Sequence, residues 1–151
     1  MSYDFGLSQK VSECDTSGDV FFGGLWEFEP LCRAMSTLGT KCEDDVWQID
    51  VSAFAGYRKA YAELMAIPEI VTYRTLCGVD FSLAHEYFAS LPVSVRAEAA
   101  CAFRKENLGD AGVVLWEFFS DEHPSFVFEI LESCANVEAL GVDKLYLWQS
   151  Y

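Results

Sequence analysis

Apolar and polar side chains alternate along residues 46–51, where every second residue is apolar and the residues between are polar. This period of two is typical of a half-buried β-strand. Other short segments are rich in aromatic and β-branched residues, which favour strands. They predict three further strands, over residues 20–28, 113–119 and 142–148.

Apolar residues that recur every three or four positions predict helices elsewhere. The helices expected from this spacing cover residues 53–66, 81–90, about 94–107 and about 124–135. Ser52 and Asp80 are placed to cap the first two of these helices. Pro30 and Gly39 are placed to open and close a further short helix, and Pro124 opens the helix at 124–135.

Three of these helices have an expected apolar face. It consists of Phe54, Tyr57, Tyr61 and Leu64 in the helix at 53–66, of Phe81, Ala84, Tyr87, Phe88 and Leu91 in the helix at 81–90, and of Ala97, Ala100, Cys101 and Leu108 in the helix at about 94–107. Residues 69–77, rich in Val, Thr and Tyr, fit either a helix or a strand.

These elements predict one α+β domain with a single sheet of about four strands, five or six helices and a helix-rich middle. Parallel pairing of some strands stays open. The length of 151 residues suits one domain. Residues 1–19 are polar with few apolar anchors, so we expect an N-terminal segment that is at most partly ordered. The globular domain is then expected over residues 20–151.

Composition narrows the classes of partner. The chain carries 10 Lys and Arg against 24 Asp and Glu, a net charge of −14. This charge argues against direct binding of nucleic acid or of anionic membranes.

No signal peptide or membrane span is recognisable, so we expect a cytoplasmic location. The six cysteines show no zinc-ligand spacing and are expected to be reduced, mostly buried thiols.

The negative charge lies towards the two ends of the sequence. Residues 1–50 hold ten acids and three bases and residues 101–151 nine and three, whereas residues 51–100 hold five and four. If the end strands share one sheet, their acids can form one face. A solvated face that keeps the protein soluble is the simpler interpretation. The functional interpretation is a docking surface that comprises Trp26, Glu27, Glu29, Glu43, Asp44, Asp45, Asp121 and Glu122.

Sequence motifs for catalysis are absent. The chain has no phosphate-binding glycine loop, no nucleophile elbow and no zinc-protease motif. Of the two histidines, His85 is expected on a helix surface and His123 at a cap or turn. We therefore predict no catalytic residue, no metal and no cofactor.

The profile favours a small acidic cytosolic inhibitor that binds a basic, nucleic-acid-acting protein and occludes its functional surface. Immunity proteins and counter-defence proteins of phages or mobile elements share this single-domain, acidic, aromatic-rich profile.

Two alternative functions stay open. One is a small enzyme of unrecognised family that uses Cys, His or carboxylates. The other is a chaperone or adaptor that oligomerises through aromatic strands, which also leaves a homodimer open.

Overall fold

The computed structural model describes residues 3–9, 28–121 and 123–150, together with the backbone of 20–23. Within these ranges, five strands form one sheet in the order β2-β1-β5-β4-β3, and all neighbouring strands are antiparallel. The strands are β1 (Asp4–Ser8), β2 (Val20–Gly23), β3 (Thr40–Glu43), β4 (Val46–Asp50) and β5 (Lys144–Ser150). The α+β class is confirmed, and no parallel pair occurs among these strands.

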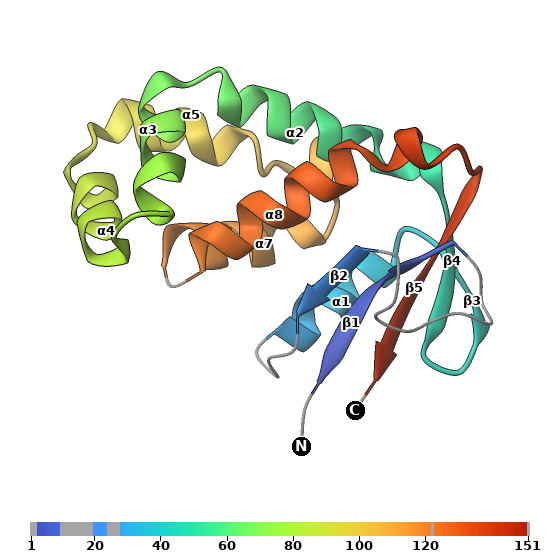
Figure 1. The fold of residues 1–151 in the computed structure, drawn as a ribbon. Helices are drawn as coiled ribbons and strands as arrows, with labels where there is room; N and C mark the ends of the chain where they lie inside the picture. The colour runs from blue at the N-terminus through green and yellow to red at the C-terminus, as the bar shows by residue number, and fades with distance from the viewer. Residues whose placement is uncertain (1–2, 10–19, 24–27, 122, 151) are drawn as a thin grey trace.

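Most of the helices gather in one body beside the sheet (Figure 1). The α-helices are α1 (Glu29–Ser36), α2 (Ala55–Met65), α3 (Pro68–Cys77), α4 (Phe81–Ser90), α5 (Val93–Cys101), α6 (Lys105–Leu108), α7 (Ala111–Ser120) and α8 (Pro124–Ala135). Two short 3₁₀ helices, η3 (Val51–Phe54) and η4 (Val137–Leu140), connect this body to the sheet. Helix α1 contacts both strand β5 and helix α7, so it lies between the two parts.

Strand β1 lies inside the sheet, between β2 and β5. Its Phe5 and Leu7 side chains have no exposed surface. Within the N-terminal segment 1–19, which is expected to be partly ordered, Asp4–Ser8 forms a strand of the sheet, while residues 10–19 lie outside the described ranges. In the sequence, the two large apolar residues Phe5 and Leu7 are only a weak indication of a strand. Pairing along both edges stabilises this strand, and that pairing is a tertiary property.

Several predicted elements are confirmed near the expected positions. They are β4 at 46–51, β5 at 142–148, α2, α4 and α8, and the short helix α1 that contains Pro30. The Asp80 side chain caps α4 by accepting a hydrogen bond from the Leu83 N–H at 3.2 Å. Strand β2 covers the first four residues of the predicted strand at 20–28, and residues 24–27 lie outside the described ranges. The ambiguous segment 69–77 is helical, with Pro68 in its first turn.

The predicted strand at 113–119 is wrong, because these residues belong to helix α7. Ala111, Leu115 and Phe119 are buried at four-residue spacing, as expected for one side of a helix. A short, continuous apolar run does not distinguish a buried helix from a strand. Here α7 packs against the helices α1, α6 and α8.

Three local predictions also need correction. Ser52 does not cap α2, because η3 precedes that helix and Phe54 occupies the cap position. The single helix expected at 94–107 is divided into α5 and α6, since the chain turns inward at 102–104 and buries Phe103. Three residues expected to face inward are exposed: Phe81, Ala97 and Cys101.

Candidate functional site

The turn between β3 and β4 carries three consecutive acidic residues of the predicted docking surface, Glu43, Asp44 and Asp45. Glu43 and Asp44 are exposed, and Lys41 lies 3.9 Å from the Asp44 carboxylate. Asp45 has a φ of 60°, a left-handed conformation that Asp tolerates better than most residues. The turn therefore presents carboxylates to solvent from a short hairpin.

Gln149 on β5 fixes this turn. Its backbone N–H donates to the Asp45 carbonyl oxygen at 3.0 Å, and its Nε2 donates to Asp45 Oδ1 at 2.9 Å. The Gln149 Oε1 in turn accepts a hydrogen bond from the Tyr3 hydroxyl at 3.1 Å. The acidic turn is thus held in one conformation by the central part of the sheet.

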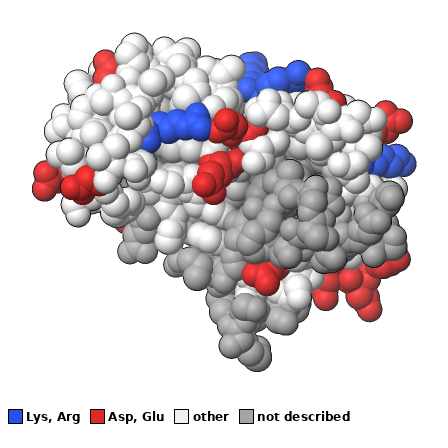
Figure 2. All heavy atoms as spheres, viewed as in Figure 1, with Lys and Arg blue, Asp and Glu red and all other residues white. Residues whose placement is uncertain are grey.

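Glu29 is the first residue of α1 and shares a recess with Gln149, the residue that binds Asp45. Its Oε1 accepts a hydrogen bond from Arg33 Nη2 at 3.2 Å. Glu29, Arg33, Ser36, Trp47 and Gln149 line a recess of about 270 Å³. We call Glu29, Glu43, Asp44 and Asp45 the acidic end. Figure 2 shows acidic side chains gathered at the part of the molecule where the β3–β4 hairpin lies.

The structure does not bring all the predicted docking residues together. Asp121 ends α7, and the α7–α8 connection lies on the other side of the molecule from the β3–β4 hairpin (Figure 1). Trp26, Glu27 and Glu122 lie outside the described residues. Glu132 on α8, an acid outside the predicted docking surface, forms an ion pair with Arg74. Three of the eight predicted residues, Glu43, Asp44 and Asp45, are therefore adjacent, and Glu29 is connected to them through the recess that it shares with Gln149.

Three of the five described cysteines, Cys32, Cys77 and Cys134, lie in surroundings that disfavour a thiol nucleophile. Burial raises the pKa of Cys32 to about 11, with Glu29 and Asp45 adding to the rise and a hydrogen bond with Tyr3 opposing it. Burial likewise raises the pKa of Cys134 and of Cys77. A raised pKa keeps these thiols protonated, and the thiolate is the reactive form. Cys42 and Cys101 are exposed, which corrects the expectation that Cys101 is buried.

The histidines lie where the sequence predicts. His85 is exposed on α4, and its ring stacks over Phe81 with the centroids 6.4 Å apart. His123 occupies the cap position of α8, and its ring contacts Phe28 edge-on. Among the described residues, no three His, Cys, Asp or Glu side chains are grouped to hold a metal ion.

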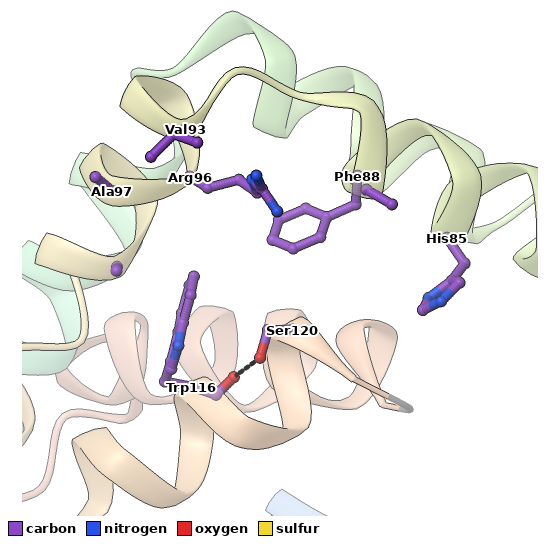
Figure 3. A pocket seen from close by; sticks show the side chains of 9 residues that line it. His85, Phe88, Val93, Arg96, Ala97, Trp116 and Ser120 are labelled. Carbon is purple, nitrogen blue, oxygen red and sulfur yellow. Dashed lines mark hydrogen bonds between the residues drawn. The ribbon is translucent and has the colours of Figure 1, made fainter.

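A second candidate site was not foreseen from the sequence. A groove of about 400 Å³ opens between α4, α5 and α7 (Figure 3). Its lining consists of His85, Phe88, Ala89, Val93, Arg96, Ala97, Ala100, Trp116 and Ser120. The sequence signal at this place is the row of small residues on α5, which predicts a buried helix face.

Comparison of the chain with protein-family models, curated proteins and solved structures gives no significant match. None of the helices in the described part of the chain is both long enough and apolar enough to cross a membrane. The candidate sites therefore have to be interpreted from their own geometry and charge.

Proposed function

We propose that this protein is an inhibitor-type binding protein that docks, through the acidic end, on a basic surface of a protein partner and covers it. The observation that carries the proposal is the anchored turn: Asp45 is held by two hydrogen bonds from Gln149, while Glu43 and Asp44 face solvent. A fixed acidic turn loses little conformational freedom on binding. The basic partner is expected to be a protein that acts on nucleic acid.

The surroundings of the turn also support a protein partner. Strand β3 is a short edge strand whose four residues are all exposed. Beside it, the half-buried Trp47 lines the recess at Glu29, and aromatic side chains of this kind often anchor protein interfaces. The acidic end combines four carboxylates with the cations Lys41 and Arg33. Its excess of negative charge would steer a basic partner towards the hairpin.

The test compares two double charge reversals with the same change in net charge. Glu43→Lys with Asp44→Lys alters the acidic end and leaves Asp45 and its anchor intact. Glu98→Lys with Glu117→Lys alters exposed acids on α5 and α7. The partner is isolated with the wild-type chain, and its association rate with each variant is measured at low and moderate salt.

We expect the first variant to associate about tenfold more slowly at low salt, since charges at an interface rim act mainly on the association rate. The second variant should stay within about twofold of wild type on the same principle. Equal rates for both variants, or a wild-type rate that does not change with salt, would contradict the proposal.

A further inference from the structure

The groove between α4, α5 and α7 has the size and lining of a small-molecule site. Its volume of about 400 Å³ lies within the range of about 300–1,000 Å³ typical of ligand pockets. Phe88, only 6% exposed, forms part of the wall, and Trp116 points into the space from α7 (Figure 3). Ala97 and Ala100 are short side chains on α5 and leave the space open.

Arg96 points from α5 into this apolar groove (Figure 3). Its Nε is buried and has no hydrogen-bond partner. Among the described residues, no carboxylate lines the groove, and the other titratable side chain there is the exposed His85. A guanidinium that is partly removed from water and left unpaired loses hydration without compensation.

The other four arginines of the chain differ from Arg96 in their ion pairing. Each forms an ion pair with a glutamate: Arg33 with Glu29, Arg58 with Glu138, Arg74 with Glu132 and Arg104 with Glu63. Acids outnumber bases 24 to 10, so carboxylate partners are abundant. Arg96 is the one arginine of the described chain without a carboxylate partner.

We propose that the groove binds a small aromatic monocarboxylate, with the carboxylate on the Arg96 guanidinium and the aromatic body between Phe88 and Trp116. The planar guanidinium can donate two parallel hydrogen bonds to a carboxylate. Aromatic rings pack well against other aromatic side chains. This site lies in the helical body and is independent of the acidic end, so it goes beyond the proposed function.

The net charge of the chain makes the test selective. A chain with a net charge of −14 repels anions, so non-specific association favours a neutral compound over an anion of the same shape. Cinnamate and cinnamamide differ in charge but have nearly the same size and planar shape. Binding of both to the full chain is measured by calorimetry and by NMR titration. We expect wild type to bind cinnamate about tenfold or more tightly than cinnamamide.

Three variants identify the groove as the site. Arg96→Met keeps an apolar side chain of similar reach and should abolish the preference for cinnamate. Lys105→Met removes an exposed cation on α6 and should keep the preference. Ala97→Trp places a large side chain at an exposed lining position and should block both compounds. Thermal unfolding of each variant shows that it is folded.

Several results would overturn the proposal. They are no binding of either compound to wild type, cinnamamide binding as tightly as cinnamate, and a preference for cinnamate that survives in Arg96→Met.

A different occupant of the groove would be a second copy of the chain. In that case light scattering would show a dimer that Ala97→Trp dissociates, and that result would likewise refute a small-molecule site.

Discussion

Gln149 binds Asp45 through two hydrogen bonds, one from its backbone N–H and one from its side-chain amide, at 3.0 and 2.9 Å. The two residues are 104 positions apart in the sequence. Asp45 has a positive φ, a conformation that costs free energy for residues other than glycine. The final strand of the sheet therefore stabilises the conformation of the acidic turn.

Replacing Gln149 with Leu should lower the free energy of unfolding by about 1–2 kcal/mol, because it removes the side-chain hydrogen bonds to Asp45 and Tyr3. Urea denaturation measures this change. Gln48→Leu is the matched control on β4, since its Nε2 lies 3.4 Å from the Tyr146 hydroxyl and forms a weaker bond. A loss for Gln48→Leu as large as that for Gln149→Leu would contradict the anchoring role.

Two buried tyrosines should respond differently to loss of the hydroxyl group. The Tyr57 hydroxyl is buried without a hydrogen-bond partner, and burial raises its pKa well above the ordinary value. Tyr57→Phe should therefore leave stability unchanged or increase it. The Tyr73 hydroxyl donates to the Phe119 carbonyl oxygen at 3.3 Å, so Tyr73→Phe should cost about 1 kcal/mol. Thermal unfolding of both variants checks the order, and a larger loss for Tyr57→Phe would contradict it.

Glu63 should make stability depend on pH in the acid range. Two hydrogen bonds from Arg104, both 2.8 Å, hold the pKa of this carboxyl below its ordinary value of 4.5, and Asn107 adds a third. The folded state therefore binds its proton less readily than the unfolded state does. This stability is present above pH 4.5 and is lost as the pH falls through the lowered pKa of the folded state.

Glu63→Gln should flatten the loss of stability on acidification, measured as the denaturation midpoint at a series of pH values. Arg104→Met should flatten it similarly, and the double variant should add little further change. An undiminished acid dependence in either single variant would show that this pair is not its source.

Gly56 should tolerate no side chain. A Cβ at this position would lie 1.8 Å from the carbonyl oxygen of Asn107, where α2 meets α6. Gly56→Ala should cost about 3 kcal/mol, because backbone must move. At Gly78 the nearest atom would be 3.6 Å away, so Gly78→Ala should be neutral or stabilising by up to about 1 kcal/mol. Equal stabilities of the two variants would argue against the close packing of α2 on α6.

Cysteine labelling should follow burial. Iodoacetamide should modify the exposed Cys42 and Cys101 in the native protein, whereas Cys32 and Cys134 should react only after unfolding. Peptide mapping by mass spectrometry distinguishes these sites. Rapid labelling of Cys134 in the native state would show that the helical body opens more readily than its packing implies.

Local patterns in the sequence predicted those elements that depend on local physics. The alternation at 46–51 identified β4, and the capping carboxylate of Asp80 identified the start of α4. Pro124 correctly marked the first turn of α8. In each case the signal itself lies within a few consecutive residues, as an alternation of side chains, a capping carboxylate or a proline.

Only the tertiary structure decided the remaining features. The apolar run at 113–119 is a helix because helices surround it, and Asp4–Ser8 is a strand because two strands flank it. The acidic residues of the two sequence ends gather only in part, since Asp121 follows α7 and the α7–α8 connection lies away from the β3–β4 hairpin (Figure 1). Arg96 has no carboxylate partner among the described residues because the side chains that α4, α5 and α7 place around it are mostly apolar. Such long-range arrangements depend on packing between distant segments, whereas the charge of −14 and the helical periodicity are fixed by the sequence itself.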